Sequence, residues 1–328
     1  MYQMMSLPLY SGTFQEYDSW RDLGQELERL GCDGIEGVWG GEDLPKDLPA
    51  ELILGYHLIF YPDWLDFYRD DRAALKQKFG SLEAVASFYG GLGPDTLLEQ
   101  YRADLRRAVN LGARYVVFHV SDVSLEEGYT YRWLPTNQEV IDAAVEVVNL
   151  ILGEERWPFE FLVENQWWPG FTFTEPEETA RLLEGIRFAG KGILLDTGHL
   201  MNACTELKTE AEGADYIRRM LNRHGSLAKW VRGVHLHQSL SGAYVKAHTG
   251  SLPAGLPEDY MERFGVSYQH ILQIDQHRPW TDPAILPVLE QIEPRYLTHE
   301  LSSRGRMARA EAVSIQTRLL RQGGRMRV

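Results

Sequence analysis

Eight short strand-like runs alternate with amphipathic helical stretches along almost the whole chain, and this alternation constrains the fold most strongly. Most runs are rich in β-branched or aromatic residues, and a glycine follows several helical stretches, as at Gly31, Gly112 and Gly153. Strands that alternate with helices pair in parallel, and eight such units favour a closed (β/α)₈ barrel over an open sheet. The predicted strands are Met4–Tyr10, Gly34–Val38, Leu52–Phe60, Arg114–Val120, Glu160–Asn165, Gly192–Asp196, Val231–His237 and Tyr296–Leu301. The predicted helices are Phe14–Leu30, Thr96–Leu111, Asn137–Leu152, Pro176–Phe188, Ala211–His224 and Pro283–Ile292.

The length of 328 residues suits one large α/β barrel, so a single domain over residues 1–328 is predicted. Two segments are too long for a minimal strand–helix unit: residues 62–94 after the third strand and residues 238–274 after the seventh. Both follow strands, so we expect both insertions on the carboxyl face of the barrel, where active sites are built. Residues 304–328 contain seven arginines and one glutamate and are predicted to form a solvated basic helix with a frayed end.

The charge and the cysteine content exclude several classes of protein. The net charge is −14, which repels a phosphate backbone, so no nucleic-acid partner is expected. Two cysteines cannot build a disulfide framework, which fits a reducing compartment. Met1–Tyr10 has no basic residue before its apolar stretch, and the longest apolar runs are far short of the ~20 residues that span a bilayer. We therefore expect a cytoplasmic protein without a membrane partner, and homo-oligomerisation stays open.

Six consecutive predicted strands carry a histidine, aspartate or glutamate at or near their carboxyl ends. In a barrel these ends converge on one mouth, so residues far apart in sequence are expected to lie close together. Each alone has a simpler explanation, such as a hydrogen-bonded core histidine or a solvated carboxylate. The residues are His57, His119, Glu164, Asp196 with His199 close behind, His235 with His237, and Glu300.

Three carboxylates and several imidazoles at one mouth point to a metal site. Buried carboxylates without compensation cost several kcal/mol each, and divalent cations are the simplest compensation. Mixed imidazole and carboxylate ligands suit Zn²⁺, Mn²⁺, Fe²⁺ or Co²⁺, and we expect one to three ions of Zn²⁺ or Mn²⁺.

The motifs VEN, LLDTGH, RGVHLHQS and THEL, on the fifth to eighth predicted strands, resemble those of the xylose-isomerase-like TIM barrels. This superfamily contains sugar-phosphate isomerases and epimerases, inosose-processing enzymes and endonuclease IV. The resemblance extends roughly from the second strand to the eighth. It implies a TIM barrel with a metal site at its mouth.

The resemblance also implies roles for individual residues. Glu164, Asp196, His235 and Glu300 match the four metal ligands of the isomerases and epimerases, with His237 as the alternative ligand of the seventh strand. Glu164 and Glu300 would then move the proton, and His199 would orient a substrate hydroxyl or bind a second metal. The pattern Asp275-x-His277 matches further ligands, separated from the seventh strand by the insertion. His57 and His119 match two histidines of the trinuclear zinc site of endonuclease IV.

Several residues near the mouth could contact a small carbohydrate-like substrate. Trp167 and Trp168 directly follow the Glu164 motif and could stack on a sugar ring, although packing of loops explains such tryptophans equally well. His237 and Arg278 are further candidates, Arg278 for a phosphate or carboxylate.

The function predicted first is a metal-dependent isomerase or epimerase acting on a sugar, a sugar phosphate or a related polyol, because this activity is common in the resembled superfamily. The first alternative is a multinuclear phosphoester hydrolase with a small substrate other than DNA, which the number of ligands favours. The second is a metal-binding barrel without catalytic activity.

Overall fold

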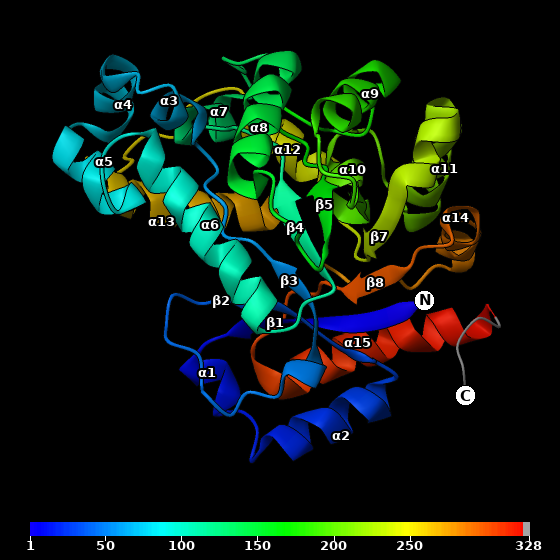
Figure 1. Cartoon of the computed structure of the whole chain (residues 1–328). Helices are drawn as coiled ribbons and strands as arrows, with labels where there is room; N and C mark the ends of the chain where they lie inside the picture. The colour runs from blue at the N-terminus through cyan, green and yellow to red at the C-terminus, as the bar shows by residue number, and fades with distance from the viewer. Residues whose placement is uncertain (324–328) are drawn as a thin grey trace.

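The computed structural model describes residues 1–323 and confirms the predicted closed barrel, in which eight parallel strands pair in chain order and β8 pairs with β1 (Figure 1). Each predicted strand-like run overlaps one strand of the barrel. Parallel neighbours need a long crossover connection, and helices supply these crossovers around the outside. The strands are β1 (Tyr2–Leu9), β2 (Gly34–Trp39), β3 (Ile53–His57), β4 (Tyr115–His119), β5 (Glu160–Glu164), β6 (Lys191–Asp196), β7 (Val231–His235) and β8 (Tyr296–His299).

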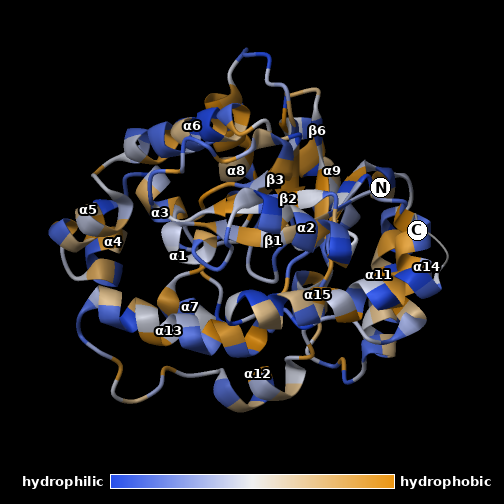
Figure 2. Ribbon diagram, turned by 90° about the horizontal axis from the view of Figure 1, so that it is seen from below, coloured by the Kyte–Doolittle hydropathy of each residue, from blue (hydrophilic) through white to orange (hydrophobic). Residues whose placement is uncertain are grey.

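The helices are amphipathic and form the outer layer. Figure 2 shows hydrophobic and hydrophilic residues interspersed along the helices that surround the strands. Within residues 1–323, no helix is long and apolar enough to cross a membrane. The α-helices are α1 (Ser11–Phe14), α2 (Trp20–Leu30), α3 (Leu65–Tyr68), α4 (Arg72–Phe79), α5 (Leu82–Tyr89), α6 (Pro94–Asn110), α7 (Leu125–Thr130), α8 (Asn137–Leu152), α9 (Pro176–Gly185), α10 (Thr197–Asn202), α11 (Glu210–His224), α12 (Gly242–His248), α13 (Tyr260–Ile274), α14 (Leu286–Ile292) and α15 (Gly305–Gln322). Short 3₁₀ helices are η1 (Ala50–Leu52), η2 (Gly225–Trp230) and η3 (Pro283–Ile285).

Two predicted helices are divided in the structure. The predicted helix Phe14–Leu30 is interrupted, because Ser19 has an extended backbone and caps the start of α2 at Trp20. The predicted helix Pro283–Ile292 divides into η3 and α14, since Pro287 has no N–H to donate to the preceding turn.

The segments predicted as insertions form helices that pack on one another. Residues 62–94 contain α3, α4 and α5, and residues 238–274 contain α12 and α13. The ring of Phe79 in α4 stacks on that of Tyr260 in α13, with 3.8 Å between the ring centroids. Two segments that follow different strands therefore meet beside the barrel, as Figures 1 and 2 both show.

The basic C-terminal helix is packed, so the prediction of a solvated helix is wrong for α15. Val313 is fully buried, and Arg306 forms ion pairs with Asp22 and Glu26 of α2. Arg306 therefore helps to hold this helix against α2. Residues 324–328 of the predicted segment lie outside the described residues.

The interior of the barrel is apolar away from its mouth and polar near the mouth, at the carboxyl ends of the strands. One cluster of buried side chains from the strands comprises Met4, Leu54, Tyr115, Val117, Leu162, Leu194 and Tyr296. The hydroxyl of Tyr115 leaves this cluster and donates a hydrogen bond to Glu36 at 2.6 Å. Tyr115 therefore joins the apolar filling of the barrel to the polar residues nearer its mouth.

A glycine on β3 provides the space that Tyr115 needs. A Cβ atom at Gly55 would lie 2.3 Å from the ring of Tyr115. We expect Gly55→Ala to lower the free energy of unfolding by about 1–3 kcal/mol, because the packed interior cannot accommodate the methyl group. Thermal unfolding measures the change. In the control variant Gly24→Ala on α2, where the nearest atom is 4.0 Å away, alanine should leave stability equal or higher. Equal melting temperatures for the two variants would contradict this account.

Candidate metal centre

The carboxyl ends of β3 to β8 bring the predicted ligands of six strands together. Five of these residues are the last residue of their strand, and the sixth directly follows β8. The strand register places His119 opposite Glu164 and Asp196 opposite His235. The six residues, in strand order, are His57, His119, Glu164, Asp196, His235 and Glu300.

A first group of ligands consists of His57, His119 and Glu164. The Nε2 atoms of His57 and His119 lie 3.3 and 3.0 Å from Oε2 of Glu164 and 3.0 Å from each other. Three atoms with lone pairs thus converge on a common point.

A second group consists of Glu164, Asp196, His235 and Glu300. Nδ1 of His235 lies 2.8 Å from Oε2 of Glu300, 3.4 Å from Oε1 of Glu164 and 3.7 Å from Oδ2 of Asp196. Glu164 therefore faces the first group with one carboxylate oxygen and the second group with the other.

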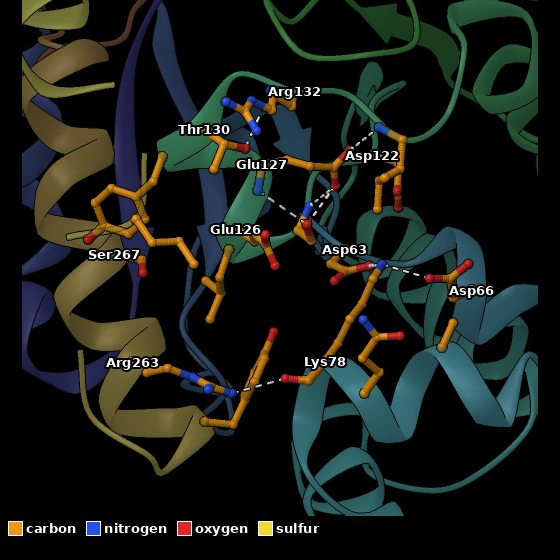
Figure 3. Close-up of a pocket in the computed structure, with 18 of the residues that line it drawn as sticks. Asp63, Asp66, Lys78, Asp122, Glu126, Glu127, Thr130, Arg132, Arg263 and Ser267 are labelled. Carbon is orange, nitrogen blue, oxygen red and sulfur yellow. Dashed lines mark hydrogen bonds and ion pairs between the residues drawn. The ribbon is translucent and has the colours of Figure 1, made fainter. Parts of the chain in front are cut away.

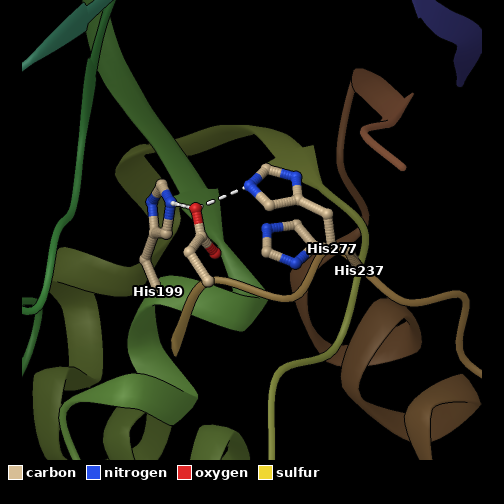
Figure 4. Close-up of side chains that lie close together, drawn as sticks. His199, His237 and His277 are labelled. Atoms are coloured by element: carbon tan, nitrogen blue, oxygen red, sulfur yellow. Dashed lines mark hydrogen bonds and ion pairs between the residues drawn. The ribbon is translucent and has the colours of Figure 1, made fainter. Parts of the chain in front are cut away.

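A third group consists of His199, His237, Asp275 and His277. Figure 4 shows His199 on one side and the stacked rings of His237 and His277 on the other, with 4.0 Å between the stacked centroids. Oδ2 of Asp275 lies 2.6 Å from Nε2 of His277 and 3.3 Å from Nε2 of His199. The long segment after β7 thus returns Asp275 and His277 to the mouth.

Asp196 connects the second and third groups. Its Oδ2 atom lies 2.9 Å from Nε2 of His237, and its Oδ1 atom accepts a hydrogen bond from the backbone N–H of His199. Asp196 is also the N-cap of α10, so the start of this helix fixes the carboxylate. Gly198 is required in this turn, because a Cβ atom there would lie 2.0 Å from the ring of His237.

Backbone carbonyls orient three of the histidines. Nδ1 of His57, His199 and His277 lies 2.9–3.1 Å from the carbonyl oxygens of Leu58, Asn165 and Glu300. Because a carbonyl only accepts, Nδ1 of His57 is the protonated nitrogen of the neutral ring, and its Nε2 then has a lone pair that faces the first group. The same kind of contact turns Nε2 of His199 and His277 toward the third group. Such outer contacts are typical of histidines that bind metals.

His235 is oriented by Glu36, a residue that the sequence analysis missed. Nε2 of His235 lies 2.8 Å from Oε1 of Glu36, which leaves Nδ1 to face the second group. Oε2 of Glu36 accepts hydrogen bonds from Tyr115 at 2.6 Å and from Thr298 at 3.0 Å, and all four side chains are fully buried. The signal in the sequence is a single acid in the middle of an apolar strand, between Ile35 and Gly37.

The ligand atoms of Glu164, His235 and Glu300 fit a metal better than they fit one another. Both carboxylate oxygens of Glu164, Oε2 of Glu300 and Nδ1 of His235 are buried without a hydrogen-bond partner in the described residues. Burial alone would raise the pKa of Glu164, but His119 and His235 hold it well below its usual range. Anionic oxygens and imidazole nitrogens that converge without hydrogen-bond geometry suit divalent ions such as Zn²⁺ or Mn²⁺.

The residues predicted to contact substrate differ in their positions. Trp167 is buried with its ring 5.2 Å from that of His199, and Trp168 is buried against Trp167. The sequence predicts His237 as a substrate contact or as an alternative ligand to His235. It lies in the third group, whereas His235 lies in the second, so the two histidines belong to different groups. The side chain of Arg278 is exposed and forms no hydrogen bond or ion pair with any residue of 1–323, while its backbone pairs with Gln238. Arg278 as a substrate contact therefore stays a prediction.

Comparisons with known proteins agree with the barrel fold. A model of the xylose isomerase-like TIM barrel family matches residues 25–293. None of the curated proteins matches the chain. Endonuclease IV from Thermus thermophilus is 15% identical, with 98% of this chain and 100% of that chain covered and a TM-score of 0.53. A D-tagatose 3-epimerase-like protein is 15% identical, with 99% and 98% covered and a TM-score of 0.51. The IOLI protein with a zinc atom is 16% identical, with 98% of each chain covered and a TM-score of 0.51. At these identities the likeness shows the fold.

The contact between Glu36 and His235 generates a prediction about metal affinity. Glu36→Gln keeps the shape of the side chain but removes the charge that holds His235. We expect Mn²⁺ affinity to fall about 10- to 100-fold, because outer contacts of metal-binding histidines have effects of this size. Calorimetric titration of the metal-free protein measures the affinity. Glu160→Gln, at the opposite end of β5, is the matched control and should bind Mn²⁺ normally. Normal affinity in Glu36→Gln would show that His235 does not depend on this contact.

The three groups also predict the number of bound metal ions. We expect elemental analysis of untreated protein to find three divalent ions for each chain. His57→Gln and His277→Gln should each remove one ion, because they belong to different groups. A single ion for each chain would contradict the assignment. A metal content that neither substitution changes would also contradict it.

Proposed function

Because the chain belongs to the xylose isomerase-like TIM barrel family, we propose that it is a metal-dependent enzyme that hydrolyses a phosphoester. The observation that carries this proposal is the set of three adjoining ligand groups, two of which share Glu164. An isomerase or epimerase of the resembled kind needs the second group and at most one more. That reaction does not need the first group, which contains His57 and His119. The geometry therefore favours hydrolysis over the isomerisation that the sequence predicted first.

The chain's own residues support this chemistry. Divalent ions bound here would supply a water of lowered pKa and a positive clamp for the phosphoester oxygens. Glu164 lies between the first and second groups, and Asp196 lies between the second and third. Trp167 covers the side of His199, and the ring of Phe60 lies 4.3 Å from that of His119. These rings would limit the access of bulk water to the reacting bond.

A small phosphoester is favoured over nucleic acid as the substrate. The net charge of −14, to which Asp63, Asp66, Asp70 and Asp71 in the segment after β3 contribute, opposes the approach of a polyanion. Endonuclease IV shares the fold, and its name indicates action on nucleic acid. A substrate with one phosphate is repelled far less by the negative charge of this chain than a polyanion is. We therefore propose a non-polymeric substrate.

Epimerisation is the second candidate, because two carboxylates flank one centre. Oε2 of Glu300 and Oε1 of Glu164 lie 2.8 and 3.4 Å from the same nitrogen of His235. Two carboxylates on either side of a bound carbonyl could remove and return a proton. The similar D-tagatose 3-epimerase-like structure is compatible with this candidate.

Hydrolysis of bis(p-nitrophenyl) phosphate in the presence of Mn²⁺ tests the first candidate. We expect Glu164→Gln to lower kcat/KM by about 10³-fold, because it removes the ligand that two groups share. Glu160→Gln, the same substitution at the other end of β5, should keep the activity. Absence of hydrolysis by the protein with three bound ions would contradict the proposal.

Two further assays separate the alternatives. Epimerisation of D-tagatose with deuterium uptake from D₂O, abolished by Glu300→Gln but retained in His57→Gln, would support the second candidate over the first. Incision of abasic-site duplex DNA at physiological salt, abolished by Asp196→Asn, would contradict the proposed exclusion of nucleic acid.

A further inference from the structure

A cavity of about 910 Å³ lies beside the barrel, between the two inserted segments (Figure 3). Its wall comes from the segments after β3, β4 and β7, within residues 63–78, 122–139 and 252–267. None of the candidate metal ligands lines it. Asp122, on its wall, lies three residues after His119, so their Cα atoms are within about 11 Å of each other. The cavity is thus a separate compartment near the metal centre, of a size that suits an organic ligand.

One part of the cavity wall, here called the floor, comprises Asp63, Asp66, Lys78, Asp122 and Glu127. The floor contains more acidic than basic side chains. Asp63, Asp122 and Glu127 are buried carboxylates, each only 2% exposed. Nζ of Lys78 lies 2.7 Å from Oδ1 of Asp63 and 2.7 Å from Oδ2 of Asp66, as Figure 3 shows. One ammonium group therefore pairs with two carboxylates, Asp63 and Asp66, and Oδ2 of Asp63 has no hydrogen-bond partner in the described residues. Asp122 and Glu127 have no cationic partner there and instead accept hydrogen bonds, Asp122 from backbone N–H groups and Glu127 from backbone N–H groups and the hydroxyl of Ser124.

Burial and the excess of acidic side chains raise the pKa values of two carboxyl groups at the floor. Burial, Asp66 and Glu127 raise the pKa of Asp63 to about 6, although Lys78 opposes the shift. Burial and the neighbouring Asp63 raise the pKa of Asp122 to about 7. Their ionised forms are destabilised, and an additional cation would relieve that destabilisation.

Charges nearer the outside of the cavity do not supply this cation. Three further arginines line the cavity, and three further glutamates match them in number: Arg69, Arg132 and Arg263 against Glu126, Glu139 and Glu258. The guanidinium of Arg263 donates a hydrogen bond to the backbone oxygen of Lys78. The excess of negative charge at the floor therefore persists.

The geometry suits an organic cation better than a metal ion. Among residues 1–323, no three carboxylates or imidazoles of this cavity converge within 4.8 Å, in contrast to the groups at the barrel mouth. Dispersed carboxylates beside an apolar lining favour an amphipathic amine or ammonium group over a compact metal ion. The apolar and aromatic lining residues include Leu65, Leu125, Tyr129, Leu252, Leu256 and Tyr260.

We propose that this cavity binds an amphipathic organic cation, with its positive group beside Asp63 and Asp66 and its apolar body against Leu125 and Leu256. The excess of buried carboxylate excludes an anionic ligand of the same shape, because such a ligand would add a further unpaired charge. This site does not depend on the proposed hydrolysis, since it shares no residue with the metal centre.

Fluorescence titration with two dyes of opposite charge tests the proposal on the full chain in its metal-bound form. Thioflavin T is an amphipathic cation, and anilinonaphthalene sulfonate is an amphipathic anion. We expect thioflavin T to bind at least about tenfold more tightly than the anion. Equal affinities, or preference for the anion, would overturn the proposal.

Two pairs of variants locate the bound dye. Leu125→Trp fills the cavity and should weaken thioflavin T by about tenfold, while Leu150→Trp, at an exposed leucine of α8, should not. Asp66→Asn removes one carboxylate and should weaken binding about threefold to tenfold, while Asp70→Asn, outside the cavity in the same segment, should not. Circular dichroism identifies a variant that does not fold, in which case the other pair decides.

Unchanged affinity in both folded cavity variants would overturn the proposal. Loss of thioflavin T binding to the wild-type chain on addition of Ca²⁺ at equal concentration would also overturn it, because a metal would then be the preferred occupant. Dye binding without hydrolysis would contradict only the proposed function, and hydrolysis without dye binding would contradict only the cavity site.

Discussion

The closure of the barrel determines the chemistry of this protein, because it converts charged strand ends into buried charges that face one another. Glu164, Asp196 and His235 are fully buried at the mouth, where carboxylates without compensation would be strongly destabilising. The arrangement is compatible with a stable fold only if imidazoles, protons or metal ions balance the carboxylates. The ligand groups, the residues that orient them and the helices that fix them all follow from this requirement.

The orienting residues connect the candidate metal centre to the interior of the barrel. Glu36 holds His235 from below and is itself held by Tyr115, whose ring belongs to the apolar filling between the strands. Gly55 leaves the space for that ring. The position of Nδ1 of His235 therefore depends on a series of contacts that extends from the mouth into the apolar core. These contacts link the stability of the barrel to the geometry of the candidate site.

The loops after the strands add what the barrel itself lacks. The segment after β7 returns Asp275 and His277 to the mouth, where they complete the third group. The segments after β3, β4 and β7 also enclose the neighbouring cavity, whose buried carboxylates are balanced by Lys78 alone among the cations at its floor. Both features use buried acids, but the converging ligands suit metal ions, whereas the dispersed carboxylates and apolar lining suit an organic cation.

The sequence by itself determined the barrel and the residues at its mouth, because the alternation of strands and helices implies parallel strands whose carboxyl ends meet. It could not assign His235 and His237 to separate groups, since two histidines two residues apart are distinguished only by the path of the chain after β7. Glu36 was missed because a single acid in a strand has no local sign of its partners, which are up to 262 residues away at Thr298. Arg278 was named because it follows a ligand motif, but only the tertiary structure shows that its side chain is exposed. The cavity also depends on contacts between distant segments, such as that of Phe79 with Tyr260, which no local pattern encodes.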